Sequence, residues 1–154
     1  MTSSAIVRPA RRSDISALVA LRGEMFEAMG APAGDPTWRD NAGAWFRDRL
    51  DDPAFRIVVV EVDDDVVACA MGAIRDAAPS PSVPDGRDVL ISTVCTRPDS
   101  RGRGHARRAF DAVMEWARAQ GIGRAELMAT PAGRSMYESA GFVETRFPAL
   151  RCRL

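Results

Sequence analysis

Apolar residues recur along the first third of the chain with the periods of one strand and two helices. Ala5–Pro9 predicts a short first strand, and Ser13 follows at the position of a helix N-cap, with Asp14 in the first turn. Three- and four-residue spacing then predicts a helix ending near Gly30 and a second helix ending before Pro53. The spaced positions are Ile15, Leu18, Leu21, Met25 and Met29 in the first helix, and Trp38, Ala42, Trp45, Phe46 and Arg49 in the second. We interpret both tryptophans as core residues, with an aromatic pocket as the alternative.

The rest of the chain alternates between strand-like and helix-like segments. The predicted strands are Phe55–Val62 and Val66–Ile74, which form a hairpin across the aspartates at 63–65, then Val89–Thr96, Arg124–Thr130 and a closing pair, Phe142–Phe147 and Leu150–Leu154. Helices are predicted from the turn near residue 105 to Gln120, with Gly121 as C-terminal cap, and over Pro131–Ala140. Residues 75–88 are rich in proline and predict an irregular segment, either a surface connection or one wall of a substrate site. The order β-α-α-β-β-β-α-β-α-β-β predicts one α/β (α+β) domain over residues 1–154, built around a mixed sheet.

The most informative segment is the passage from the strand Val89–Thr96 into the helix that follows. It crosses Pro98 and then Arg101-Gly102-Arg103-Gly104-His105-Ala106 before the amphipathic stripe begins. Glycines allow a ligand close to the backbone, and the first N–H groups of a helix lack internal partners and favour an anion. The segment therefore predicts a site for a phosphorylated ligand; the alternative is an ordinary strand-turn-helix with glycines for tightness alone.

Two other phosphate-binding motifs do not fit. A Walker A loop requires lysine, and the chain contains none. A dinucleotide fingerprint requires a third glycine where this chain has Arg107.

Composition and residue spacing argue against several classes of partner and cofactor. The formal net charge is +0, which gives no electrostatic reason to expect nucleic acid or an anionic membrane as partner. The cysteines, Cys69, Cys95 and Cys152, form no paired motif and are interpreted as reduced thiols, and no spacing of ligands indicates a metal site. No signal-like or membrane-length apolar run is present, so we expect a cytoplasmic protein. The basic residues are all arginine, which suggests a GC-rich bacterial source.

Two motifs resemble the GNAT superfamily of acetyl-CoA-dependent N-acyltransferases. Arg101, Gly104 and Ala106 match the family signature Gln/Arg-x-x-Gly-x-Gly/Ala, and Tyr137 with Gly141-Phe142 is similar to its Tyr-x-x-x-Gly-Phe ending. The order of elements is also similar over nearly the whole chain. The resemblance implies a mostly antiparallel sheet flanked by about four helices, with acetyl-CoA as co-substrate and no metal.

The resemblance also assigns residues to the co-substrate. It implies that the amides of Arg103, Gly104, His105 and Ala106 hold the pyrophosphate, with Gly102 shaping the turn and Arg101 adding charge. Main-chain groups of Val94 and Thr96 would pair with the pantetheine arm as an added strand does. An N–H near Val94 or Cys95 would stabilise the developing oxyanion. Thr130 stands where the family often has Asn, and its hydroxyl is a further expected contact.

For the chemistry, the resemblance places a general acid at Tyr137, the only tyrosine, with ring packing as the alternative. The base is open. Some family members use a Glu where this chain has Leu90, so Asp88 and Ser92, on the same face, are the candidates for holding a proton-carrying water. Glu24 and Glu27 are a second possibility, with a solvated helix face as the simpler reading. His105 lies in the turn and is expected to act through its backbone.

These residues predict an N-acetyltransferase that moves an acetyl group to a primary amine of a small molecule or protein by direct attack. A non-catalytic acyl-CoA-binding module is the alternative. The expected partners are acetyl-CoA and an amine acceptor, and the protein is expected to be a monomer or homodimer.

Overall fold

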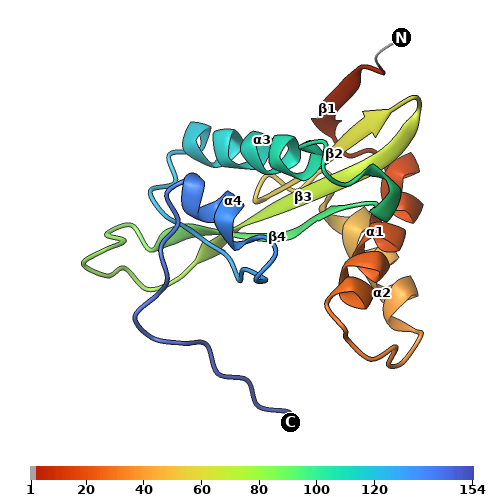
Figure 1. Ribbon diagram of the computed structural model, residues 1–154. Coiled ribbons are helices and arrows are strands. Elements are labelled where there is room, and N and C mark those ends of the chain that lie inside the picture. Colours follow the sequence, from red (N-terminus) through yellow and green to blue (C-terminus); the bar gives the residue numbers. More distant parts are fainter. Residues whose placement is uncertain (1–2) are drawn as a thin grey trace.

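The computed structural model describes residues 3–154 as strands and helices in the predicted alternation (Figure 1). In chain order the elements are β1 (Ala5–Pro9), α1 (Ile15–Ala28), α2 (Trp38–Arg49), β2 (Phe55–Val62), β3 (Asp65–Asp76), β4 (Arg87–Thr96), α3 (His105–Ala119), β5 (Ala125–Glu126) and α4 (Arg134–Ser139). Short 3-10 turns occupy Arg12–Asp14 and Pro98–Ser100. No helix within residues 3–154 combines the length and apolarity needed to cross a bilayer.

The strands form a sheet in the order β1-β2-β3-β4-β5. Neighbours are antiparallel except β4 and β5, which are parallel and pair only at Val89 with Ala125 and Leu90 with Glu126. Helices cover both faces, with α3 and α4 on one and α1 and α2 on the other (Figure 1). This mixed, mostly antiparallel sheet with four helices confirms the predicted fold class.

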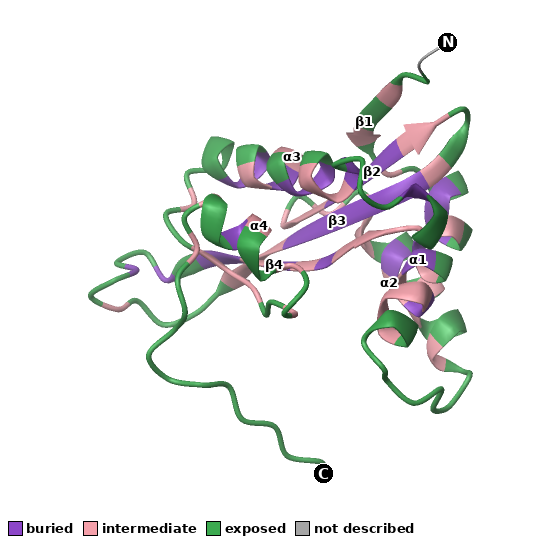
Figure 2. Ribbon diagram, viewed as in Figure 1, coloured by how far each residue is buried: buried purple, intermediate pink, exposed green. Residues whose placement is uncertain are grey.

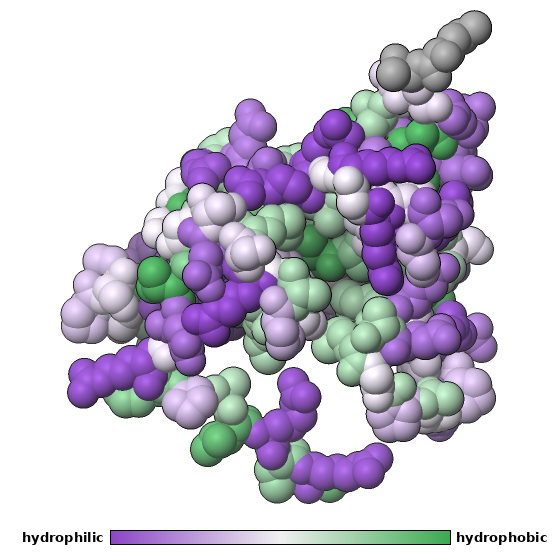
Figure 3. Space-filling view, viewed as in Figure 1, coloured by the Kyte–Doolittle hydropathy of each residue, from purple (hydrophilic) through white to green (hydrophobic). Residues whose placement is uncertain are grey.

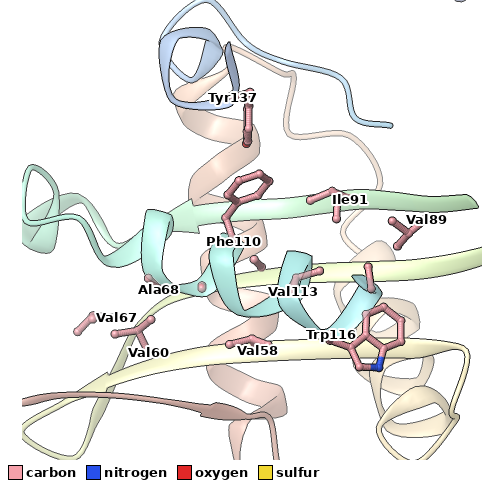
Figure 4. Packing of buried hydrophobic residues seen from close by; sticks show 13 residues of the cluster. Val58, Val60, Val67, Ala68, Val89, Ile91, Phe110, Val113, Trp116 and Tyr137 are labelled. Carbon is pink, nitrogen blue, oxygen red and sulfur yellow. The ribbon is translucent and has the colours of Figure 1, made fainter. Parts of the chain in front are cut away.

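Strand alternation divides the core into two clusters, one on each face of the sheet. On the α3 face, Phe110 and Val113 are fully buried against Val58, Val89 and Ile91 (Figure 4). The approach of α3 to β3 is close, because a Cβ at Gly72 would lie 2.7 Å from Val113 Cγ1. On the opposite face, apolar side chains of α1 and α2 pack on β2 and β3, with Leu18, Phe46, Val59 and Cys69 among the most buried.

The prediction of the last strands is wrong. The strand predicted over Arg124–Thr130 is only Ala125–Glu126, and residues 143–154 contain neither strand nor helix. The predicted pair Phe142–Phe147 and Leu150–Leu154 is therefore absent. Residues 143–154 extend from the body with every residue exposed, so the alternation in this segment has no packed face to stabilise it (Figure 2).

The predicted start of the first helix also needs correction. Residues 12–14 form a 3-10 turn and α1 begins at Ile15, so Ser13 is not its N-cap. The carboxylate of Asp14 instead accepts hydrogen bonds from the Arg11 amide at 2.7 Å and from both Arg8 terminal nitrogens at 2.7 and 3.0 Å. This buried ion pair fixes β1 against the helix entry.

Candidate active site

The turn before α3 has the backbone geometry of an anion site. Gly102 and Gly104 adopt φ of +78° and +79°, and Gly104 is the N-cap of α3. A Cβ built on either glycine would meet no atom of residues 3–154 within 4 Å, so open space faces the turn. Within the described chain the main-chain N–H groups of residues 102–107 donate no hydrogen bond, and the first donor is the Arg108 amide to Gly104 O at 3.1 Å. Unpaired amides at a positive helix end suit a phosphate group.

The side chains around the turn add positive charge. Arg101 and Arg103 are exposed, and Arg101 Nε donates to Thr96 O at 3.3 Å, which ties the turn to the end of β4. His105 is buried beside Arg108, whose Nη1 lies 3.2 Å from its Nδ1. Burial, with Arg108 and Arg103 nearby, lowers the pKa of His105, so this imidazole is neutral near pH 7. At the first turn of α3, His105 and Ala106 therefore present backbone amides without partners in the described chain, and the His105 ring carries no charge.

A bulge in β4 interrupts the pairing of this strand with β3. Thr93 has φ +54°, and the register with β3 slips between Cys69, opposite Cys95, and Met71, opposite Ser92. A bulge bends and twists its strand. Because β5 pairs with β4 only at Val89 and Leu90, the β4 edge opposite β3 has no strand partner from Ile91 to Thr96 within residues 3–154. Val94, Cys95 and Thr96, all half-buried, lie on this stretch, as the sequence predicted.

The exposed side of this edge is apolar. Figure 3 shows hydrophobic side chains gathered over β4, between α4 and α1, with hydrophilic side chains around them. The turn before α3 lies at the end of the same strand (Figure 1). The arrangement offers an anion site at the turn and an unpaired strand edge leading away from it.

Tyr137 reaches toward the sheet from α4. Its ring contacts Phe110 of α3 with centroids 5.3 Å apart and also packs near Phe142 at 6.1 Å (Figure 4). Arg107 fixes α4 by donating to Met136 O at 3.3 Å and to Ser139 Oγ at 2.9 Å. Burial, with a smaller contribution from Cys95, raises the pKa of the Tyr137 phenol. The group is therefore neutral and able to donate a proton near pH 7.

Ser92 lies on the other face of β4, in the wall of a cavity of about 490 Å³ between the sheet, α1 and α2. Four aromatic side chains line this cavity: Phe26, Trp38, Trp45 and Phe46. Trp38 packs edge-to-face on Phe26 at 5.7 Å and Trp45 on Phe46 at 5.6 Å. Both tryptophans line this cavity and neither is fully buried, while Trp45 also packs against the core cluster of this face, as the core interpretation predicted.

Asp88 does not have the surroundings of a base. Its buried carboxylate accepts from Arg75 Nε and Nη2 at 2.8 and 2.7 Å, and from Arg124 Nη2 at 3.0 Å. The hydrogen bonds from Arg75, followed by those from Arg124, lower its pKa below the usual range. Asp88 also lies at the opposite end of β4 from the turn. Asp88 therefore links β3, β4 and the segment before β5, and its surroundings do not support the predicted catalytic role.

The remaining candidates differ in accessibility. Thr130 Oγ1 accepts from the Gly133 amide at 3.3 Å and so shapes the turn before α4. Glu27 is exposed, as a solvated helix face requires. Glu24 is half-buried, and its Oε2 has no hydrogen-bond partner among residues 3–154, but Glu24 does not line the cavity.

Sequence reasoning missed Arg22. This residue lines the cavity, and its Nη1 donates to Thr93 Oγ1 at 2.7 Å. The available signal was its spacing: Arg22 stands four residues after Leu18 and four before Phe26, on the side of α1 that faces the sheet. Its partner Thr93 is 71 positions away, which no local pattern reveals.

Comparison with known proteins identifies the family to which this fold belongs. Residues 17–142 match the model of the acetyltransferase (GNAT) family. Because the match covers most of the chain, the chain belongs to this family and is an acetyltransferase, as the sequence predicted. A comparison with curated proteins finds no match.

Solved structures agree. A predicted acetyltransferase with acetyl-CoA from Clostridium acetobutylicum is 26% identical with TM-score 0.86, covering 96% of each chain. A GCN5-related N-acetyltransferase from Ralstonia eutropha JMP134 is 23% identical with TM-score 0.87, covering 97% of this chain and 99% of the other. The aminoglycoside N-acetyltransferase AAC(6')-Iy in complex with CoA is 18% identical with TM-score 0.78, covering 99% and 97%. The last two similarities, below 25% identity, concern the fold alone.

Proposed function

We propose that this acetyltransferase moves the acetyl group of acetyl-CoA to a primary amine by direct attack. The observation that carries the proposal is the pairing of two sites on β4. The anion turn with its unpaired strand edge serves the donor, and the aromatic cavity at Ser92 serves the acceptor.

The donor site fits the chemistry of CoA in two parts. The unpaired amides of Arg103, Gly104, His105 and Ala106 can donate to pyrophosphate oxygens, with Arg101 and Arg103 neutralising charge. The unpaired edge at Val94 and Thr96 can form strand-like hydrogen bonds with the amides of the pantetheine arm. The hydroxyl of Thr130, in the loop before α4, provides a further contact with CoA.

The reaction requires one bond to form and one to break. The neutral amine attacks the thioester carbonyl carbon, the carbon–sulfur bond breaks, and the amine nitrogen loses a proton. An N–H of Val94 or Cys95 stabilises the developing oxyanion. Tyr137 gives its phenolic proton to the departing sulfur and is reprotonated from solvent. The products are the N-acetylated amine and CoA with a free thiol.

Deprotonation of the acceptor is assigned to a water held by Ser92. An alkylammonium with a pKa of about 10.4 must lose a proton before it can attack. Ser92 lines the acceptor cavity and can hold a proton-carrying water there. Glu24 remains the alternative because one of its oxygens is buried without a partner in the described chain.

A non-catalytic acyl-CoA-binding module is the second candidate, and the lack of a strand glutamate at Leu90 favours it. The two are separated by following the release of free CoA thiol with acetyl-CoA and a panel of primary amines. Amine-dependent thiol release supports the transferase. Tight acetyl-CoA binding with no release for any amine supports the module.

A further inference from the structure

The acceptor cavity contains one charged group. Arg22 lies at its wall with Asn41 and Ser92 as the polar neighbours, and the rest of the lining is aromatic or apolar. Arg22 is half-buried, and its guanidinium carbon lies 4.9 Å from the centroid of the Phe26 ring. Among residues 3–154, no aspartate or glutamate lines this cavity.

Arg22, like the half-buried Arg49 and Arg56, has no acidic partner within residues 3–154, and of these three arginines Arg22 alone lines the cavity. Arg8 pairs with Asp14 and Glu61 at 2.7 and 2.6 Å, and Arg75 pairs with Asp88 at 2.7 Å. Within residues 3–154 no carboxylate lies within 4.0 Å of the Arg22 guanidinium, and its one hydrogen bond is to the neutral Thr93 hydroxyl. Burial lowers the pKa of Arg22 from its ordinary value, but a guanidinium remains charged. The cavity therefore holds an uncompensated cation with free donors on Nη2 and Nε.

We propose that the acceptor is a primary amine that also carries a carboxylate, which Arg22 binds, and an apolar or aromatic body, which packs among the rings of the cavity. This inference rests on the proposed function, because it takes the cavity at Ser92 as the acceptor site. A planar carboxylate matches the guanidinium fork and supplies the missing counter-charge. Aromatic walls stabilise an apolar body by burial and ring contacts.

The same charge disfavours a polycationic acceptor. A second cation beside Arg22 would meet like charge in a cavity without acidic residues, which costs rather than gains binding energy. The resemblance to an aminoglycoside N-acetyltransferase therefore does not extend to the acceptor, in keeping with its 18% identity.

Arg22 also has a structural contact, and the test must separate the two roles. Its hydrogen bond to Thr93 Oγ1 at 2.7 Å supports the bulge at φ +54°. Loss of that support would impair every acceptor alike. Loss of carboxylate recognition would impair only acceptors that carry one.

The experiment compares acceptors that differ by a single carboxylate: tryptophan with tryptamine, and phenylalanine with phenethylamine. For the wild-type protein, kcat/KM is expected to be higher for the carboxylated member by roughly 10- to 100-fold, the range for hydrogen bonds to a charged group. Arg22→Gln should bring the ratio toward one while the KM for acetyl-CoA changes little, and Arg22→Lys should restore part of it. Arg47→Gln, an exposed arginine of α2 outside the cavity, is the matched control and should keep the wild-type ratio.

Binding of the same pairs to CoA-loaded protein, followed by calorimetry, gives a readout that does not depend on turnover. Tighter binding of the carboxylated members, lost in Arg22→Gln, supports the proposal even where chemistry fails. Equal binding and turnover of both members would overturn it, as would an equal loss for both in Arg22→Gln. Preference for glucosamine 6-phosphate over glucosamine, without a preference within the carboxylate pairs, would overturn the carboxylate in favour of a phosphate. Absence of turnover with intact carboxylate-dependent binding would overturn the proposed function alone.

Discussion

The Tyr137 ring packs edge-to-face against Phe110, with centroids 5.3 Å apart and planes inclined by 67°. The contact joins α4 to α3, the helix whose N-terminus forms the anion turn. Arg107 adds a second link between the helices through Ser139 Oγ at 2.9 Å. The ring is thus held by packing against Phe110 and Phe142, while no hydrogen bond within residues 3–154 engages its hydroxyl.

Replacing Tyr137 with Phe tests the general acid. The variant keeps the contact with Phe110 and removes the proton donor, so kcat is expected to fall by about 10²- to 10⁴-fold. The Kd for acetyl-CoA should change little, because the amide and strand contacts lie elsewhere. Single-turnover kinetics separate the two quantities. Wild-type turnover in the Phe variant, with chemistry rate-limiting, would return Tyr137 to a packing role.

Two glycines at opposite ends of α3 give a matched test of the anion turn. Gly104 and Gly121 have φ of +79° and +74°, and a Cβ on either would meet no atom of the described chain within 4 Å. Valine should strain the backbone equally at both positions, at a cost of about 1–2 kcal/mol. Gly104→Val should in addition abolish the thermal stabilisation by acetyl-CoA, which follows from mass action in the wild type. Gly121→Val should keep it.

The decisive measurement is the shift of Tm with acetyl-CoA concentration in each variant. Equal shifts in the two variants would show that the turn does not approach the phosphates. An absent shift in the wild type would remove acetyl-CoA from the proposed function.

Local features of the fold were predictable from the sequence. The hairpin across residues 63–65 could be predicted because a run of aspartates separates two strands rich in β-branched residues. In the structure, Asp63 and Asp64 adopt the positive φ typical of tight turns. The turn at Gly102 and Gly104 could also be predicted, because its glycines and arginines directly precede the apolar face of α3 in the sequence. The absence of strands from residues 143–154 could not be predicted, since alternation alone does not show whether a packed face exists.

The parts of the site that depend on distant residues escaped prediction. Asp88 lies on the predicted face of its strand, but its partners are Arg75 and Arg124, and those ion pairs decide its role. The bulge at Thr93 is a shift in the pairing of β4 with β3, and Arg22, 71 positions earlier in α1, donates a hydrogen bond to Thr93. The sequence of the strand alone therefore does not predict the bulge. Neither relationship has a local signature.

Activity is expected to be unaffected by EDTA or a reducing agent. No group of three His, Cys, Asp or Glu side chains in the described chain could hold a metal ion. Cys69 Sγ lies 3.5 Å from Cys95 Sγ, and this hydrogen bond and burial raise the pKa of the Cys69 thiol, which keeps it protonated. Thiol release in the presence of each reagent, corrected for its reaction with the detection dye, measures the effect. Loss of activity with EDTA that one specific metal restores would contradict this expectation.

Asp88→Asn separates a structural carboxylate from a catalytic one. The change leaves Arg75 and Arg124 without counter-charge, but their side chains are 37% and 47% exposed, so water compensates in part. We expect the free energy of unfolding at about pH 7 to fall by about 1–3 kcal/mol, below the cost of breaking a fully buried pair.

The stability difference between the wild type and Asp88→Asn should depend on pH, because the ion pairs of Asp88 require an ionised carboxylate. The folded-state pKa of Asp88 lies below the unfolded value, so its stabilisation is fully present above about pH 4 and disappears as pH falls through the folded pKa. A protonated Asp88 resembles Asn, and the wild type and the variant should therefore converge in stability at the acid end. Urea unfolding of both proteins at about pH 7 and about pH 3 measures the difference. At about pH 7, kcat should change little, because the carboxylate is occupied by two arginines. A fall in kcat of about 100-fold or more with unchanged stability would instead make Asp88 the base.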